Sequence, residues 1–489
     1  MDSANTMNQT RGVPCWRPPV QPSFDEHLLE RILDPGNLRE AFERVEANKG
    51  APGIDGMKVE DFREWAKEDW PGIVQSIRDG SYAPSPVRRT EIPKDNGSKN
   101  PKYRKGPKRK GRNAPPRRRD VSRRKGKMRR LGIPTVLDRT IQQAISQVLT
   151  PIFDPLFSKF SYGFRPCRSA HQAVKQLQSY IREGYKIAVD VDLEKFFDTV
   201  NHDLLMERLG RRIKDKRVLR LIKSFLLSGV EIRTKIPAKQ GRGGYKAKII
   251  KQVDPTLEGV PQGGPLSPLL ANIMLDDFDK ELERRGHKFA RYADDFIIVV
   301  KSQRAGERVL ANVTKLLKKT FKLTVNEAKS QVVPTDECSF LGFTFKGTQI
   351  RWTEKSYKKF IARIKELTSR TWGVSMEHRF LKLRQYIVGW MGYYRLSEYY
   401  QPVADIDGWL RRRIRMCYLK QWGRMKTIIK KLLGLGVPIQ RAVGLGRSSK
   451  AWWGRTKNPI IHEGLSNKYL KSQGLVNIKD QWVAFHYPK

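Results

Sequence analysis

Two adjacent acids interrupt a run of strand-forming residues in Arg291-Tyr-Ala-Asp-Asp-Phe-Ile-Ile-Val-Val300. A short extended run precedes Asp294 and Asp295, and a strongly β-forming run follows them. This layout predicts a β-hairpin with both carboxylates at its tip. An Asp-Asp turn is by itself more often structural than catalytic, because Asp suits tight turns.

A second acidic strand precedes this hairpin in the chain. Ile187-Ala-Val-Asp-Val-Asp-Leu193 is an apolar run that ends in acids, and Glu194-Lys-Phe-Phe-Asp198 follows it. A carboxylate at the end of a buried strand is costly unless it is hydrogen-bonded or bound to a cation. Strand-end acids that converge with an Asp-Asp turn therefore indicate a Mg²⁺ site. Two such ions ~3.5–4 Å apart activate a hydroxyl and stabilise leaving pyrophosphate, which is the chemistry of nucleotidyl transfer.

A glycine-rich loop, Gly259-Val-Pro-Gln-Gly-Gly-Pro-Leu-Ser-Pro-Leu-Leu270, lies between these two elements. Two glycines beside Gln262 permit close approach of the backbone to a ligand, and Ser267-Pro268 is typical of a helix start. Alone, the loop is a weak signal. The order of acidic strand, Gln-Gly-Gly loop and Asp-Asp hairpin is specific.

The charge of the chain points to a polyanionic partner. Lys and Arg number 96 against 50 Asp and Glu, a net charge of +46, and such self-repulsion is destabilising without countercharge. Nucleic acid is therefore the first partner to expect. The segment 95–128 alone holds fifteen Lys and Arg against two Asp, a net +13. We expect it to be a solvated insertion that can order on contact with nucleic acid.

Several classes of protein are disfavoured by what the sequence lacks. No apolar run reaches the ~18 residues that a membrane span needs, and the start of the chain lacks the layout of a secretory signal. We therefore expect a cytoplasmic protein with no membrane partner. The four cysteines are scattered without a Cys-x-x-Cys pair, so we expect free thiols and no zinc site.

Hydrophobic spacing divides the chain into regions. Residues 1–24 are polar with four prolines and read as a flexible arm, and two short helices are expected between His27 and Val45. Residues 130–345 mix strand and helix signals. After Trp352 the pattern is helical, including one long run from Trp409 to Leu433. Residues 351–489 hold 29 Lys and Arg against 8 Asp and Glu, and eight of the eleven Trp. Interleaved aromatic and basic residues suit nucleic acid, although Trp at helical spacing is more often core.

These strings together resemble the reverse transcriptases of group II introns. GVPQGGPLSPLLANI, RYADDF, DVDLEKFFDTVNHD, LGIPTVLDRTIQQAI, VNEAKS and FLGF follow the family's order over most of the chain. A His/Cys-rich nuclease tail is absent, so the chain resembles the bacterial class C proteins, which carry no endonuclease. The resemblance implies an α+β right-hand polymerase, with fingers and palm around a central antiparallel sheet at 25–345. An α-helical thumb/maturase domain would follow at 346–435, and a small basic DNA-binding region at 436–489.

The resemblance also assigns the metal ligands. It implies that Asp192, Asp294 and Asp295 hold two Mg²⁺ ions. In the family the catalytic acid stands five residues before the aromatic that excludes a ribose 2′-hydroxyl. Phe197 fills that place relative to Asp192, so Asp190 and Asp198 are expected to be structural.

Four further residues match positions that handle the deoxynucleotide. Gln262 matches the loop residue that contacts the incoming nucleotide and its template pairing. Lys94 and Arg129 match the fingers residues that hold the triphosphate, one as a point charge and one as a fork. Lys329 matches the basic residue that protonates the leaving pyrophosphate. Two departures from the family are the 34-residue basic segment between Lys94 and Arg129, and a long link at 231–254.

The last third resembles the family's thumb in Gly389-Trp-Met-Gly-Tyr-Tyr-Arg395 and Gly408-Trp-Leu-Arg-Arg-Arg-Ile414. From composition alone, such a basic helix is as often a solvated face as a phosphate-binding one. The candidate nucleic-acid contacts are Arg411, Arg412, Arg413, Arg415, Trp452, Trp453 and Arg455.

The resemblance implies an RNA-directed DNA polymerase that extends a DNA primer on an RNA template. It also implies binding of structured group II intron RNA to assist splicing, and target-primed copying of that RNA into target DNA, as a ribonucleoprotein or nucleoid-associated protein. A splicing-only maturase would be expected to have lost an acid or the Gln-Gly-Gly loop. A domesticated reverse transcriptase in defence or DNA repair stays open. A viral RNA-dependent RNA polymerase is disfavoured by the Ala-Asp-Asp turn and by Phe197.

Overall fold

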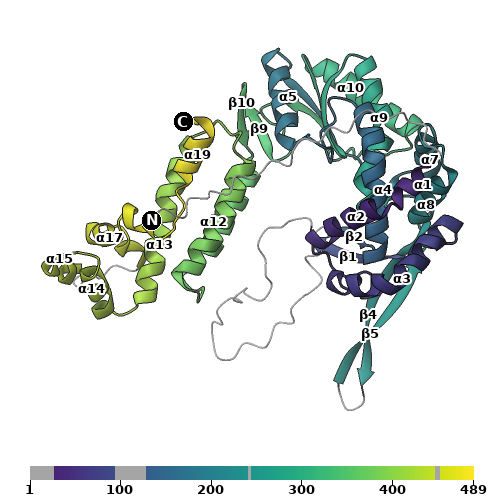
Figure 1. Ribbon diagram of the computed structural model, residues 1–489. Coiled ribbons are helices and arrows are strands. Elements are labelled where there is room, and N and C mark those ends of the chain that lie inside the picture. The colour runs from purple at the N-terminus through teal and green to yellow at the C-terminus, as the bar shows by residue number, and fades with distance from the viewer. Residues whose placement is uncertain (1–26, 94–127, 241–243, 446–451, 489) are drawn as a thin grey trace. The chain divides into compact units, whose positions relative to one another are not determined.

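The computed structural model describes residues 27–93, 128–240, 244–445 and 452–488 (Figure 1). The expected N-terminal arm, the basic insertion up to residue 127, and Lys94 lie outside the described residues. The described chain forms two compact units, of which the first ends at Pro334 and the second begins at Thr335.

The first unit contains both helices and strands. Its helices are α1 Leu28–Ile32, α2 Pro35–Ala47, α3 Val59–Asp79, α4 Val136–Phe153, the 3-10 turn η3 Asp154–Leu156, α5 Ala170–Arg182, α6 Phe196–Thr199, α7 His202–Gly210, α8 Lys216–Leu227, α9 Ser267–Arg284 and α10 Gln303–Thr320. Its strands are β1 Val87–Pro93, β2 Met128–Ile133, β3 Ile187–Val191, β4 Val230–Gln240, β5 Gly244–Asp254, β6 Lys288–Tyr292, β7 Asp295–Val300 and β8 Gln331–Pro334.

Two four-stranded sheets organise this unit. The first has the order β6-β7-β3-β8 with every pair antiparallel, as the expected central antiparallel sheet requires. Phe296 to Val300 are all buried, because α5 and α10 pack on the strands of this sheet. A continuous apolar run is typical of a strand covered on both faces.

The second sheet has the order β2-β1-β4-β5, in which β1 and β4 are parallel and the other pairs antiparallel. Pro93 pairs with Met128, so the basic segment connects the paired ends of β1 and β2. Residues 231–254, expected as a long link, form most of the β4–β5 hairpin.

Local capping explains the predicted helix starts. The Asp34 carboxylate accepts hydrogen bonds from Gly36 N at 2.9 Å and Asn37 N at 3.1 Å, and Pro35 occupies the first turn of α2. The two-helix prediction for residues 27–45 is confirmed, and α9 begins at Ser267 as expected.

The second unit is mainly helical. It contains the hairpin strands β9 Phe343–Lys346 and β10 Gln349–Trp352, and the helices α11 Glu354–Leu367, α12 Met376–Tyr393, α13 Gln401–Trp422, α14 Met425–Leu433, α15 Ile439–Gly444, α16 Trp452–Arg455, α17 Pro459–Gly464, α18 Asn467–Ser472 and α19 Ile478–His486. The single long helix predicted up to Leu433 is wrong. Gly423 adopts a left-handed φ of 67° and separates α13 from α14.

Two further expectations meet the structure here. None of the described helices is long and apolar enough to cross a membrane. The prediction of four free thiols is wrong, because Cys167 is disulfide-bonded, whereas Cys338 and Cys417 are free and buried.

Candidate active site

The predicted acidic turn joins β6 to β7. Tyr292 pairs with Asp295 across the hairpin, so Ala293 and Asp294 form the turn, and Ala293 has a left-handed φ of 60°. Val191 at the end of β3 pairs with Phe296 of β7. Asp192 follows directly and therefore stands level with Asp295. Register alone brings Asp192, Asp294 and Asp295 to one edge of the sheet.

The acids of this edge perturb one another. Loss of solvation, together with the charges of Asp190, Asp294 and Asp192, raises the pKa of Asp295 to about 7, although the surface of this residue is exposed. Burial likewise raises the pKa of Asp294, while the Arg129 guanidinium counteracts part of the rise. Burial raises the pKa of Asp190 to about 6. Asp190 thus lies close enough to Asp192 and Asp295 to interact with their charges. The sequence-based expectation is a structural Asp190, without a place among these acids.

Asp192 already has a cationic partner. Its carboxylate forms an ion pair with the Lys329 ammonium, and its backbone N–H donates to the Ser330 hydroxyl at 3.1 Å. Asn326 N donates to the Asp192 carbonyl oxygen at 2.8 Å, which fixes the turn that carries Lys329 next to β3. Lys329 therefore lies at the acids, where its predicted role requires it.

The donor set fits Mg²⁺ in its chemistry. Carboxylate oxygens are the protein ligands that this ion takes, and crowded acids with raised pKa gain from a cation. Among the described residues, no three side chains of Asp, Glu, His or Cys lie close enough together to hold a metal ion as they stand. If Asp192 bound a Mg²⁺ ion, the metal would displace Lys329 from the Asp192 carboxylate.

A buried arginine holds the acidic turn in place. Arg291 is fully buried, and its guanidinium donates to both oxygens of Asp279 on α9 at 2.6 to 2.9 Å. It also donates to the Ala293 carbonyl oxygen at 2.9 Å, to Asn272 Oδ1 at 3.0 Å and to Ser161 Oγ at 2.8 Å. Arg291 is not among the site residues predicted from the sequence. A strong cation inside an apolar strand, next to the acidic turn, was the signal that could have found it.

The Gln-Gly-Gly loop is pinned against β2. The Gln262 carbonyl oxygen accepts from Gly132 N at 2.8 Å, and Ser267 Oγ donates to the Pro261 carbonyl oxygen at 2.7 Å. Gly263 has a φ of 120°, and a Cβ at this position would lie 2.4 Å from the Gly132 carbonyl oxygen. Only glycine permits this approach.

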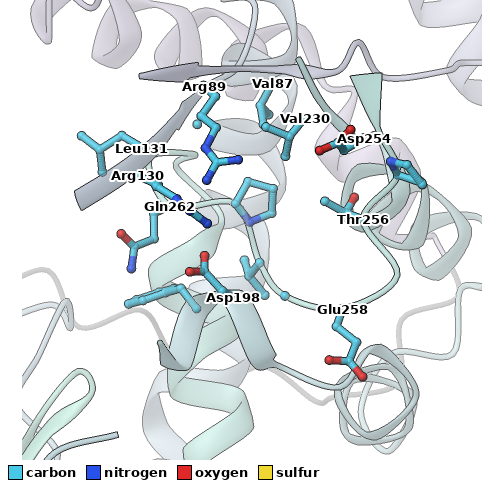
Figure 2. Close-up of a pocket in the computed structure, with 16 residues that line it drawn as sticks. Val87, Arg89, Arg130, Leu131, Asp198, Val230, Asp254, Thr256, Glu258 and Gln262 are labelled. Atoms are coloured by element: carbon cyan, nitrogen blue, oxygen red, sulfur yellow. The ribbon is translucent and has the colours of Figure 1, made fainter. Parts of the chain in front are cut away.

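Two cavities border this loop. The larger, of about 600 Å³, brings together Arg129, Phe197, Gln262 and Asp294. The smaller, of about 210 Å³, lies between β1, β2 and residues 254–262, and Figure 2 shows Gln262 at its side. Phe197 and Gln262 line both cavities, whereas the neighbouring Phe196 is buried in the core. The structure thus gathers all predicted nucleotide-binding residues that it describes around the acids.

The basic residues predicted on α13 have internal partners. Arg415 is buried, with Nε 2.9 Å from the Leu465 carbonyl oxygen, and burial lowers its pKa to about 10. Arg413 donates to Thr368 Oγ1 at 2.5 Å. Arg411 pairs with Asp407. These contacts tie α13 to its neighbours, so this helix does not present a continuous row of unengaged guanidinium groups.

The candidates near α16 form an aromatic and basic group. The Arg412 guanidinium stacks 3.8 Å above the centre of the Trp453 ring, which is 37% exposed. Arg455 lies 5.4 Å above the partly buried ring of Trp452. This group keeps aromatic surface open to solvent.

Comparison with protein families decides the identity of these units. The model for reverse transcriptase (RNA-dependent DNA polymerase) matches residues 107–345, and the model for the group II intron maturase-specific domain matches residues 357–433. The chain therefore carries a reverse transcriptase domain followed by a group II intron maturase-specific domain. The match places the acids, the Gln-Gly-Gly loop and the buried Arg291 within the reverse transcriptase domain.

Two curated relatives and one solved structure are similar to parts of the chain. Protein YkfC of Escherichia coli is 28% identical over 402 residues, which are 73% of this reverse transcriptase and 92% of YkfC. The group II intron-encoded protein LtrA of Lactococcus lactis is 31% identical over 316 residues, 64% of this chain but only 44% of LtrA. A solved partial Cas6-RT-Cas1–Cas2 complex is 28% identical, covers 60% of this chain and 42% of that chain, and has a TM-score of 0.33.

Proposed function

We propose that this protein copies RNA into DNA at the edge where β3 meets the β6–β7 hairpin. The observation that carries the proposal is the convergence of Asp192, Asp294 and Asp295 beside a cavity lined by Arg129 and Gln262. Two Mg²⁺ ions held by the three acids would activate a DNA primer 3′-hydroxyl and neutralise charge on the triphosphate.

The side chains around the acids have complementary tasks in this proposal. The charge of Arg129 offsets part of the rise that burial causes in the pKa of Asp294, so its fork can hold the triphosphate beside the acids. Phe197 lines the cavity and would exclude a ribose 2′-hydroxyl by its volume. Lys329 would release Asp192 and donate a proton to the leaving pyrophosphate. Lys94 would serve as a second triphosphate contact.

The architecture follows the same proposal. The β6-β7-β3-β8 sheet with its helices would be the palm, and the β2-β1-β4-β5 sheet would belong to the fingers. The domain limits proposed are 25–345 for fingers and palm, 346–435 for the thumb/maturase domain and 436–489 for the DNA-binding region. The exposed ring of Trp453, which stacks with Arg412 of α13, supports nucleic-acid contact in that last region, because aromatic rings with Arg suit stacked bases.

We further propose that the second unit binds the parent intron RNA to assist splicing, and that the protein then inserts a copy by target-primed reverse transcription. The maturase-specific match over residues 357–433 supports the first part. A domesticated reverse transcriptase would lack an intron. Inspection of the flanking nucleotide sequence for a group II ribozyme distinguishes the two.

Primer extension tests the catalytic proposal. The wild-type protein should extend a DNA primer on an RNA template with deoxynucleotides and Mg²⁺, and Asp294→Ala should abolish extension. Asp203→Ala, an exposed acid on α7, is the matched control and should retain full activity. Extension that survives Asp294→Ala would refute the site assignment.

A further inference from the structure

One exposed aromatic ring in the larger cavity has no role in the site described above. Phe164 is 61% exposed and lines the cavity with Arg129, Gln262 and Asp294. Its backbone has a left-handed φ of 55°, which is unfavourable for a residue with a bulky side chain. The fold therefore holds a large apolar ring in water and in a strained conformation at the active site.

The residues on either side of Phe164 explain how the ring is held outward. A Cβ on Gly163 would lie 2.3 Å from Ala293 N, and the Gly163 carbonyl oxygen accepts from Asn272 Nδ2 at 2.9 Å. Arg165 is buried and pairs with Asp154 at 2.7 Å. The backbone is thus anchored before and after Phe164, and the ring cannot collapse onto the core.

The segment that carries Phe164 extends the catalytic sheet sideways. Tyr162 N donates to the Arg291 carbonyl oxygen at 2.8 Å, and Ser161 forms a parallel bridge with Arg291, so the segment lies beside the edge strand β6. The order across the sheet is therefore this segment, β6, β7 and β3. At ~4.8 Å per strand, the segment lies ~14 Å from the strand that precedes Asp192.

This spacing favours contact of the ring with the template base over contact with the primer end. The primer end and the α-phosphate must lie at the acids, and the paired template base lies across one base pair from them. The Phe164 ring packs against Tyr292, with 5.9 Å between ring centres, so the two aromatics form one platform beside the acidic turn. Base-stacking on aromatic rings is a general mode of binding single strands.

We propose that Phe164 contacts the template, with its ring packed on the unpaired base that awaits the incoming deoxynucleotide. The inference rests on the proposed polymerase function and names a binding residue for it. The contact would fix the height of the templating base next to Gln262, so that only a correctly stacked template presents its pairing edge to the cavity.

Equilibrium binding tests the contact without requiring catalysis. A labelled DNA primer annealed to an RNA template with a single-stranded overhang is titrated with the full-length protein, without deoxynucleotide, at fixed salt. Phe164→Ala should weaken binding about tenfold, the order expected for one lost base–aromatic stack. Phe164→Tyr should restore it. Leu227→Ala, an exposed apolar residue at the end of α8, is the control and should bind as the wild type does.

An abasic template sharpens the test. With the templating base removed, the affinity of the wild-type protein for the template should fall by the same tenfold factor. Phe164→Ala should then bind this abasic template less than about twofold more weakly than the wild type does, because coupled contacts are not additive. An abasic site four nucleotides further into the overhang should leave the tenfold effect of Phe164→Ala intact. That pattern supports the proposal.

Other outcomes overturn it. Unchanged template binding, with or without a raised KM for deoxynucleotide, would show that the ring does not contact the template. A lowered melting temperature of Phe164→Ala, with equal loss on intact and abasic templates, would show a packing role. A wild-type protein that extends the primer but binds intact and abasic templates equally well would refute only this contact. A wild-type protein that neither binds the template nor extends the primer would refute the polymerase proposal as well.

Discussion

Removal of the Arg291 guanidinium should destabilise the catalytic hairpin more than any surface change. In Arg291→Leu the Asp279 carboxylate stays buried without its cation, and breaking a buried pair in this way costs about 3–5 kcal/mol. The Asn272, Ala293 and Ser161 oxygens also lose a donor. Arg291→Lys keeps the charge but a single ammonium cannot replace the fork, so we expect a loss of about 2–3 kcal/mol from missing hydrogen bonds.

Hydrogen exchange of peptides from the β6–β7 hairpin measures this effect locally. A loss of 3–5 kcal/mol corresponds to exchange that is about 10² to 5 × 10³ times faster if the hairpin opens with its domain. Arg44→Leu, which breaks an exposed pair with Glu40, is the control and should change stability by less than about 1 kcal/mol. Hairpin exchange accelerated less than tenfold by Arg291→Leu would show that the network does not hold the turn.

Three further predictions follow from single contacts. Gly263→Ala should lower primer extension, because its Cβ would displace the Gly132 carbonyl oxygen. The stability of the second unit should hardly change. Full activity of this variant would contradict the close approach. Phe197→Ala should allow ribonucleotide incorporation, measured as the ratio of kcat/KM for the two sugars, and an unchanged ratio would remove its gating role. Arg415→Met should leave the Leu465 carbonyl oxygen unpaired and destabilise the second unit by about 1–3 kcal/mol in thermal unfolding; no shift in melting temperature would refute its packing role.

The sequence predicted the reactive edge well because its elements are local. The β6–β7 hairpin around Asp294, the strand before Asp192 and the helix start at Ser267 each follow from a few neighbouring residues. Their convergence required strand order, which the sequence itself does not specify. The resemblance to a known family supplied that order. In the structure, the antiparallel pairing of Val191 with Phe296 brings the two acidic segments together.

Long-range contacts account for what the sequence did not predict. Arg291 stands out as a cation in an apolar strand, but its partners lie 12 to 130 residues away on α9 and around Ser161, so the local sequence does not show which groups it binds. Arg415 resembled a phosphate contact because its neighbours are basic, yet its partner lies fifty residues later in the chain. Gly423 breaks a helix whose apolar period continues past it, since backbone conformation overrides periodicity there.

The most direct test of the central claim is the rate of single-nucleotide addition to a DNA primer on an RNA template, measured for Asp192→Asn, Asp294→Asn and Asp203→Asn. These variants keep side-chain shape and remove one charge each. The account predicts losses of at least about 10³-fold for the first two, because each would lose a ligand of an ion worth several kcal/mol in the transition state, and wild-type rates for the third. Equal rates for all three variants, with the fold intact by circular dichroism, would contradict it.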